Sequence, residues 1–237
     1  MSFEVRTRGE FQMVVYRPWL ERGIEHGFTL APADFGEAGR ARWCGELARE
    51  FGGGELNLLH QVHGTDIIGV EMGLPGCGAG SALPSGDAFV WREASGYRGI
   101  FGVKGADCAP ILVCAPGARA AIHAGWRGLA NGVIPRVLRD LGEVGPIECV
   151  IGPCAGPDRY EVGAEVIAAI GEGFAAVRCS ESSVSLDVAR TAAAQITHAV
   201  PTAKIAVSAI NTVTDLRFHS HRRDRQNAGR GLGFFCV

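Results

Sequence analysis

Three short segments of the chain place imidazole, thiol and glycine where chemistry is expected. They are HQVHGTD at residues 60–66, GADCAPILV at 105–113 and IHAGWRG at 122–128. In each segment a His or Cys stands beside Gly or Pro at the edge of an apolar run. The end of a strand is where a side chain reaches a cleft instead of the core. The candidates for a functional site therefore come from these segments.

A zinc site is the first chemistry that these residues suggest. His63, Cys108 and His123 supply two imidazole nitrogens and one thiolate, which Zn²⁺ accepts readily. Three protein ligands with an open fourth position are typical of a catalytic zinc. The ligands are 45 and 15 residues apart, which is not the spacing of a zinc finger or ribbon. The alternative is that Cys108 is a small buried apolar residue and both histidines are polar residues of the core.

His60 competes with His63 as the ligand from the first segment. On a strand, residues 60 and 63 point to opposite faces, so only one of them should face the site. The apolar, β-rich sequence around them favours a strand. Gly64 allows close approach of the backbone next to His63. We therefore predict that His63 is the ligand and that His60 is packed or solvated.

Arg127 follows a predicted strand and a glycine turn, at the start of a predicted helix. The N-terminus of a helix binds anions through its free N–H groups. Arg127 could add a two-pronged contact to phosphate or carboxylate. The alternative for Arg127 is a surface salt bridge.

Residues 217–230 carry five arginines and are followed by the apolar segment GLGFFCV. A solvated face is the default interpretation of such a run, and a nucleic-acid surface is disfavoured because stacking aromatic residues are not interleaved. We predict that Arg222 or Arg230 folds back to the metal site and binds an anionic substrate. Ser220, Arg222 and Arg223 could equally bind one small anion.

The composition excludes several classes of protein. The chain has 237 residues, of which 47% are hydrophobic and 20% charged, so it is not intrinsically disordered. Its net charge of −2 gives no overall attraction to nucleic acid or to an anionic membrane. Its 34 glycines, about twice the usual share, indicate many tight turns. The length and the absence of a linker predict a single domain over residues 1–237.

The eight cysteines are too few for a disulfide-stabilised secreted scaffold. The N-terminal residues lack an apolar signal segment, and no run reaches the ~18 apolar residues of a membrane span. We therefore expect a cytoplasmic protein with reduced thiols. Cys154 ends a predicted strand near the candidate site. The remaining thiols outside the three segments are expected to be inert, namely Cys44, Cys77, Cys114, Cys149, Cys179 and Cys236.

Short β-rich runs and four amphipathic runs predict an α+β fold. Strands are expected at residues 12–16, 57–62, 66–71, 87–91, 99–103, 109–114, 120–123, 149–151, 183–186, 205–208 and 233–237. Helices are expected at residues 37–51, 129–141, 163–174 and 187–198. Pro135 fits the second helix only in its first turns, and Asp187 is a candidate N-cap. Residues 73–84 are rich in Gly and predict a mobile loop. The fold class is mixed β-sheets packed as a sandwich with flanking helices in one domain.

Taken together, these segments resemble the YfiH family, also called the multicopper polyphenol oxidoreductase or laccase-like family. The matching text is HQVHGTD, GDAFV, GADCAPILV, IHAGWRGLANGVI, IGPCAGPDRYEVG and RFHSHRRDRQNAGR, in order over most of the chain. The combination ADCxP followed by HAGWRG is the most specific part. The resemblance implies a single-domain α/β protein with zinc bound by His63, Cys108 and His123.

The resemblance also implies an activity. Members are associated with phosphorolysis of adenosine, inosine, guanosine and methylthioadenosine, and with adenosine deamination. A copper-dependent phenol oxidase label and a link to cell-wall precursor editing also accompany the family. The implied partners are purine nucleosides and phosphate, with neither nucleic acid nor a membrane.

The chain departs from the family pattern at three places. The segment His26–Gly27–Phe28 is not followed by the usual arginine, which puts a substrate contact in doubt. Asn211 stands where the family usually has Cys, and His221 where it usually has Tyr.

Two reactions suit one open zinc site. For deamination, zinc lowers the pKa of a bound water to about 7, and Asp107 could transfer protons. For phosphorolysis, phosphate attacks C1′ of the ribose, with Arg127, Arg222 and Arg230 as its binding residues. The arginines in the matched segments favour phosphorolysis.

Three other functions remain open. Cys108 and His123 could be the nucleophile and base of a cysteine hydrolase. A copper oxidase would use the same His and Cys ligand types. A purely structural zinc would need His60 or Cys154 as a fourth ligand.

Overall fold

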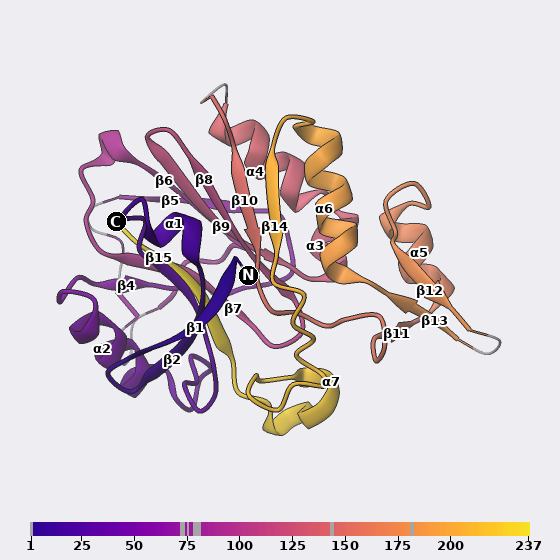
Figure 1. The fold of residues 1–237 in the computed structure, drawn as a ribbon, viewed down its shortest axis with the longest axis horizontal. Helices are drawn as coiled ribbons and strands as arrows, with labels where there is room; N and C mark the ends of the chain where they lie inside the picture. The colour runs from indigo at the N-terminus through magenta and orange to yellow at the C-terminus, as the bar shows by residue number, and fades with distance from the viewer. Residues whose placement is uncertain (1, 72–73, 75, 78–81, 143–144, 181–182) are drawn as a thin grey trace.

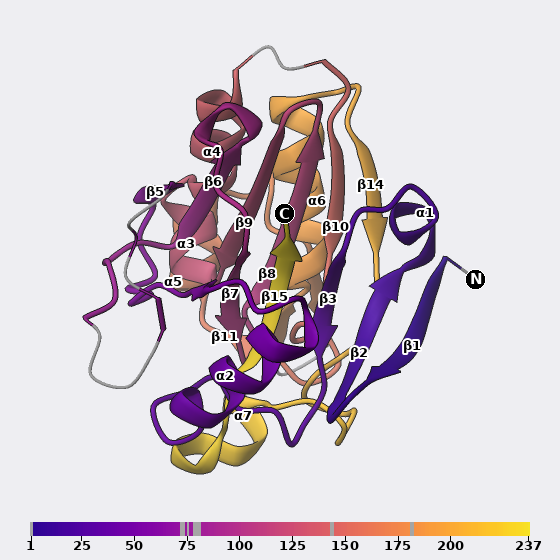
Figure 2. The same ribbon diagram turned by 90° about the vertical axis from the view of Figure 1, so that its left-hand side faces the viewer.

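The structure is a computed structural model that describes residues 2–71, 74, 76–77, 82–142, 145–180 and 183–237. Figures 1 and 2 show it in two views. The strands are β1 (Phe3–Arg8), β2 (Phe11–Tyr16), β3 (His26–Thr29), β4 (Leu56–Asn57), β5 (Ile67–Val70), β6 (Ala88–Arg92), β7 (Ile100–Gly105), β8 (Ala109–Ala115), β9 (Ala118–Ala124), β10 (Glu148–Ile151), β11 (Glu161–Val162), β12 (Val177–Cys179), β13 (Val184–Leu186), β14 (Lys204–Val207) and β15 (Gly231–Cys236). The helices are α1 (Arg17–Leu20), α2 (Arg40–Glu50), α3 (Trp126–Ala130), α4 (Val133–Leu141), α5 (Ala164–Ile170), α6 (Val188–Ala199) and α7 (His221–Asp224), with 3₁₀ turns at Glu93–Ser95 and Arg225–Asn227.

Two six-stranded mixed sheets form the body of the molecule. The first has the order β1-β2-β3-β15-β7-β4, and the second β14-β10-β8-β9-β6-β5. The C-terminal strand β15 lies inside the first sheet, antiparallel to both β3 and β7. The arginine-rich segment before β15 is therefore anchored in the fold. A small third sheet, β11-β13-β12, stands with α5 at one side of the molecule (Figure 1).

The two large sheets pack face to face. Phe28 and Phe101 of the first sheet share a buried cluster with Phe89 and Leu112 of the second. Side chains alternate along a strand, so each sheet also has an outer face. The α+β sandwich expected from the sequence is confirmed by this shared core.

Helices cover the two outer faces. Ile111 and Ile122, on the outer face of the second sheet, are buried with Val137 of α4 and Ile196 of α6. On the other side of the molecule, α2 and neighbouring loops cover the outer face of the first sheet, where Phe11, Met13 and Phe234 are buried with Trp43 and Leu47. Among the described residues, no helix combines the length and apolar character needed to cross a membrane.

Every predicted strand overlaps an observed one. The segment HQVHGTD at residues 60–66, however, does not begin in a strand as predicted. Residues 57–62 were expected to be one strand, whereas β4 ends at Asn57 and His60 forms only an isolated bridge with Ser85. After Asn57 the chain leaves the sheet for a turn. Strands β1, β3, β11 and β12 lie outside the predicted ranges, because they are very short or carry few apolar residues.

The helix expected at residues 129–141 is two helices. Helix α3 ends at Ala130, and Gly132 adopts a left-handed conformation with φ of 77° before α4 begins. That conformation is easy for Gly and costly for other residues. Pro135 then lies in the first turn of α4, where it is tolerated. The other three predicted helices are present: α2 and α5 are shorter than predicted, and α6 is shifted by one residue. Asp187 caps α6 by accepting the N–H of Arg190.

Two of the thiols expected to be reduced and inert form a disulfide. Cys44 of α2 and Cys77 are bonded, with their Cα atoms 6.4 Å apart and a separation of 33 positions in the sequence. Both lie in the buried cluster under α2. The prediction was wrong because spacing along the chain does not reveal this approach. The loop expected at 73–84 falls partly outside the described residues.

Candidate metal site and its pocket

The ends of three strands meet at one edge of the second sheet. Cys108 immediately precedes β8, and His123 in the neighbouring strand β9 is paired with Pro110. Asp87 immediately precedes β6, whose first residue Ala88 is paired with Ile122. The antiparallel register therefore brings Cys108, His123 and Asp87 to the same edge.

A turn anchored on Asp87 places His63 at this edge. The amides of Val62, His63 and Gly64 donate to the Asp87 carboxylate over 3.2, 2.9 and 2.7 Å. His63 has φ of 60°, an uncommon conformation for a residue with a side chain. Three hydrogen bonds to one carboxylate offset the cost of this conformation.

The three predicted metal ligands lie together. One ligand atom from each of His63, Cys108 and His123 falls within 4.8 Å of the other two. Nε2 of His63 is 3.9 Å from Sγ of Cys108. Nδ1 of His123 is 2.8 Å from Oδ1 of Asp87, which leaves Nε2 of His123 as its ligand atom. A ligating His commonly binds a carboxylate through its other ring nitrogen.

The donor set fits a metal of borderline softness. Two imidazoles and one thiol match zinc best and copper next. A Cβ atom at Gly125 would lie 2.7 Å from Sγ of Cys108 and 3.1 Å from the His63 ring, so only Gly leaves room here. Neither His60 nor Cys154 belongs to the group among the described residues, so a fourth protein ligand from these two is not supported.

The charges of the group are coupled. Burial alone would raise the pKa of the Cys108 thiol, but the charge of His123 and hydrogen bonds from His123 and His63 hold this pKa at about 6. Burial alone would lower the pKa of His123, but the charge of Cys108 and the hydrogen bond to Asp87 raise it to about 9. Cys108 is therefore a thiolate near neutral pH, as a metal ligand or a nucleophile must be.

A pocket of about 930 Å³ opens over the three ligands. Arg127, Arg222 and Arg230, the three predicted substrate-binding residues, all line it. The structure thus brings the three candidate metal ligands and the three candidate substrate-binding residues to one pocket. His60 also lines this pocket, contrary to the expectation that it would face away, because residues 60–63 are not a strand.

Arg222 is held in place from three directions. Its amide donates to Oδ2 of Asp107 over 2.5 Å, and its guanidinium donates to the carbonyl of Glu161 over 2.9 Å. The guanidinium carbon lies 4.7 Å from the centre of the Tyr160 ring. Burial raises the pKa of Tyr160 to about 12, so the ring stays neutral. Tyr160 lines the pocket as well.

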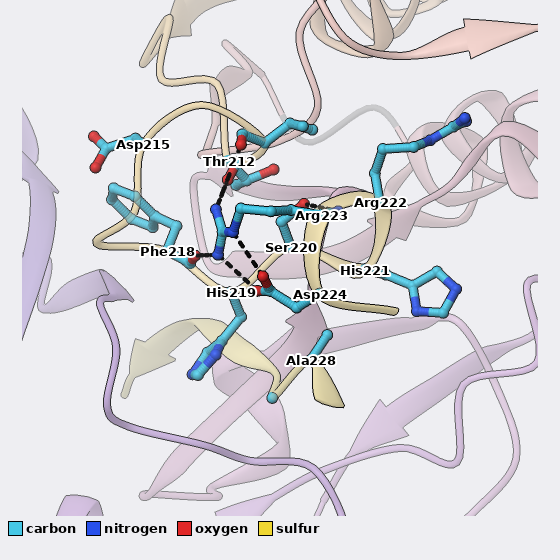
Figure 3. Close-up of polar contacts among 12 residues, drawn as sticks. Thr212, Asp215, Phe218, His219, Ser220, His221, Arg222, Arg223, Asp224 and Ala228 are labelled. Carbon is cyan, nitrogen blue, oxygen red and sulfur yellow. Dashed lines mark hydrogen bonds and ion pairs between the residues drawn. The ribbon is translucent and has the colours of Figure 1, made fainter. Parts of the chain in front are cut away.

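Arg223 points away from Arg222 and has a different role (Figure 3). Its guanidinium donates to the carbonyls of Thr212 and Phe218 and to the Asp224 carboxylate. Ser220 is fully buried and accepts the amide of Arg223 as the N-cap of α7. Ser220 and Arg223 therefore stabilise the conformation of this segment. The sequence had suggested that both could bind one small anion together with Arg222, and these contacts do not support that arrangement.

Asp107, the predicted proton carrier, is occupied at both carboxylate oxygens. Oδ1 accepts the hydroxyl of Thr212 over 2.7 Å, and Oδ2 accepts the amide of Arg222. Asp107 also has φ of 90°, immediately before Cys108. These contacts favour a role in anchoring the 212–222 segment against Cys108.

The chain matches the family model described as multi-copper polyphenol oxidoreductase laccase over residues 37–237. It belongs to this family. A purine nucleoside phosphorylase of Xylella fastidiosa (strain Temecula1) is 33% identical over 226 residues, with 85% of each chain covered. The purine nucleoside phosphorylase YlmD of Geobacillus stearothermophilus is 32% identical over 192 residues, covering 73% of this chain and 69% of the relative.

Two solved structures share the fold of this chain. The crystal structure of YlmD from Geobacillus stearothermophilus matches with a TM-score of 0.84 at 26% identity, covering 99% of this chain and 98% of that one. YfiH from Bacillus licheniformis matches with a TM-score of 0.82 at 23% identity, with 99% and 98% covered.

Sequence reasoning assigned no role to several pocket or support residues of this family member. Asp87 lies in the quoted segment GDAFV, where a buried carboxylate before an apolar strand was the available signal. No feature of the sequence pointed to Tyr160 or Lys104 as pocket residues. Asn211, where the family usually has Cys, accepts the amides of Gly156 and Val213 and so supports the loop after Cys154.

Proposed function

We propose that the protein is a metal-dependent purine nucleoside phosphorylase. It would cleave adenosine, inosine, guanosine or methylthioadenosine with phosphate, giving the free base and a ribose 1-phosphate. Zinc is the proposed metal, and adenosine deamination is a proposed second reaction of the same site. The observation that carries the proposal is the His63–Cys108–His123 group under a pocket lined by three arginines, in a chain whose relatives are named purine nucleoside phosphorylases.

The protein's own residues would orient the reactants. Zinc bound by His63, Cys108 and His123 supplies a Lewis acid. Arg127 and Arg222 flank the group and present cationic N–H donors to phosphate, with the strength of charge-assisted hydrogen bonds. The C1′–O bond to phosphate forms as the bond from C1′ to the base nitrogen breaks, and the electron pair leaves with the base. The positive charge that develops on the sugar is typical of glycoside cleavage.

The decisive experiment compares base release with and without phosphate. The metal-loaded protein is incubated with adenosine, and adenine, inosine and ribose 1-phosphate are quantified. Phosphate-dependent adenine and an equal amount of ribose 1-phosphate support phosphorolysis. Inosine formed without phosphate supports deamination. Adenine formed at the same rate without phosphate would contradict the proposal, because the enzyme would then be a hydrolase.

A cysteine hydrolase is the second candidate, and the Cys108–His123 pair favours it. A thiol with a pKa of about 6 beside a His with a pKa of about 9 is the charge state of an activated nucleophile. Alkylation separates the two functions. Iodoacetamide should modify Cys108 only after chelation if it is a metal ligand, and in the metal-loaded protein if it is a nucleophile.

A copper-dependent phenol oxidase, which the family model's description names, has weaker support. Reduction of oxygen to water at a multicopper centre needs further copper ligands. Among the described residues, one group of three or more His, Cys, Asp or Glu side chains is close enough to hold a metal. Oxidation of a phenol by the copper-loaded protein would support this alternative function.

A further inference from the structure

Lys104 lines the same pocket, near the end of β7 and on the side of the first sheet. It is one of two lysines among 23 basic residues. The other, Lys204, is exposed on β14, whereas Lys104 is half-buried. The side chain of Gln61 makes two hydrogen bonds to the backbone of Lys104. Nε2 of Gln61 donates to the carbonyl of Lys104, and Oε1 of Gln61 accepts the N–H of Lys104, each over 2.8 Å. The base of this side chain is therefore fixed.

No carboxylate neutralises the Lys104 ammonium. Within the described part of the chain, no Asp or Glu lies within 4.0 Å of its Nζ. Burial lowers the pKa of Lys104, and the charges that lower it further are those of Arg40 and Arg230. A half-buried cation whose strongest charged neighbours are also cations is unfavourable unless an anion joins them.

The acidic residues on this side of the pocket do not neutralise the Lys104 ammonium. Oδ1 of Asp34 accepts the amides of Gly36 and Arg230, so it fixes backbone. Glu37 is exposed and forms no ion pair with any residue that the structure describes. Nη1 of Arg230 donates to the carbonyls of Ala228 and Gly229, which orients its guanidinium.

The pocket thus holds two groups of cations. Arg127 and Arg222 stand beside the metal ligands, since Arg127 follows His123 by four residues and Arg222 binds the residue before Cys108. Lys104 and Arg230 form the second group, and the charge of Arg40, which does not line the pocket, acts on Lys104 from nearby. Lys104 and Cys108 are four positions apart in the sequence, which limits the distance between their Cα atoms to about 14 Å. One small ligand can reach both groups.

We infer that Lys104 and Arg230 form a second anion subsite, which binds a phosphate group carried by the nucleoside itself. The inference rests on the proposed function and extends its substrate class to nucleoside monophosphates. Inorganic phosphate would occupy the arginines beside the metal ligands. The sugar would lie between the two groups, with its 5′-phosphate on Lys104.

Equilibrium binding in phosphate-free buffer tests this inference without turnover. The metal-loaded protein, its Lys104→Met variant and its Lys204→Met variant are titrated calorimetrically with inosine and with inosine 5′-monophosphate, which cannot be deaminated. The unaltered protein should bind the monophosphate at least about 10-fold more tightly than inosine. Lys104→Met should reduce this preference by roughly 10- to 100-fold, the effect of losing a charge-assisted hydrogen bond. Lys204→Met should leave the preference unchanged.

Three results would overturn the inference. The first is equal binding of inosine and its monophosphate by the unaltered protein, which does not depend on any variant folding correctly. The second is an equal loss of preference in Lys104→Met and Lys204→Met, which would indicate a general effect of charge. The third is an undiminished preference in Lys104→Met with a raised KM for phosphate in adenosine phosphorolysis, which would assign Lys104 to the co-substrate. Failure of the proposed function would appear separately, as the absence of phosphate-dependent adenosine turnover.

Discussion

Oδ1 of Asp87 lies 2.8 Å from Nδ1 of His123, and the same carboxylate accepts the amide of His63. One fully buried carboxylate thus fixes two of the three candidate metal ligands, which are 60 residues apart in the sequence. Burial would raise the pKa of Asp87, but the hydrogen bonds from His123 and from the amides of Gly64 and Val62 lower it below its usual value. Asp87 is therefore a charged acceptor that positions both rings.

Replacing this carboxylate should weaken metal binding. In Asp87→Asn, an NH₂ group replaces one acceptor and faces backbone N–H groups. We expect metal affinity to fall by roughly 10- to 100-fold, the usual effect of losing a contact behind a metal ligand. Competition with a chromogenic chelator measures this. Asp140→Asn is the control, because Asp140 pairs with Arg92 at the surface. Equal metal affinity in both variants would show that Asp87 does not position the ligands.

Loss of a ligand should remove the metal. We expect Cys108→Ala and His123→Ala to retain little zinc after dialysis, while the unaltered protein keeps about one ion per chain. Cys179→Ala is the matched control, because Cys179 is an exposed free thiol. Elemental analysis that finds full zinc in Cys108→Ala would rule out the three-ligand assignment.

The grouping of the candidate ligands could be predicted from the sequence because its signal is local. Cys108 and His123 each stand at the end of an apolar strand beside Gly or Pro, and the strands follow one another as an antiparallel pair. Once the pairing is assumed, both side chains must lie at one edge of the sheet. The sequence argument also chose His63, but it assumed that residues 60–63 are a strand. In the structure the turn around Asp87 positions His63.

Roles that depend on long-range contacts could not be predicted. Arg222 and Arg223 are adjacent and chemically identical, yet one lines the pocket and the other binds Thr212, Phe218 and Asp224. Only the path of the chain through α7 decides between them. The Cys44–Cys77 disulfide was missed for the same reason, since it joins α2 to a distant loop.

The buried His26 should make stability depend on pH. Burial lowers the pKa of His26 to about 4, with a smaller opposite effect from the Ile24 carbonyl. Nε2 of His26 accepts the amide of Tyr16 over 2.9 Å, so protonation would break this bond. Between the unfolded pKa of about 6.5 and the folded value, the unfolded chain binds more protons. Stability is therefore complete above about pH 6.5 and is lost as the pH falls toward 4.

The contribution of His26 amounts to about 2 kcal/mol between about pH 7.5 and pH 5. Urea unfolding at both values measures it. His26→Gln should lose less free energy of unfolding over this range than the unaltered protein, by about that amount. An identical pH dependence in both proteins would show that His26 is not the responsible group.

Arg223 should matter for stability more than for chemistry. Its charged hydrogen bonds to the Thr212 and Phe218 carbonyls tie α7 to the loop after β14 (Figure 3). Arg223→Met should lower the free energy of unfolding by roughly 1.5–3 kcal/mol, the effect of losing a hydrogen bond to a charged group. Arg217→Met, at an exposed pair with Asp215, should leave unfolding unchanged. Equal stability of the two variants would contradict the anchoring role.

Arg222 should instead act on phosphate. Its guanidinium is fixed by the Glu161 carbonyl and the Tyr160 ring and lines the pocket beside the metal ligands. Removing a charge-assisted hydrogen bond costs about 1.5–3 kcal/mol, so Arg222→Ala should raise the KM for phosphate by roughly 10- to 100-fold with the metal content unchanged. Arg217→Ala, five residues earlier in the same segment, should leave that KM unchanged. Steady-state kinetics at varied phosphate, with elemental analysis of each variant, measures both quantities. If Arg222→Ala abolished nanomolar DNA or RNA binding and left nucleoside turnover intact, the segment would be a nucleic-acid surface and the assignment of Arg222 would be wrong.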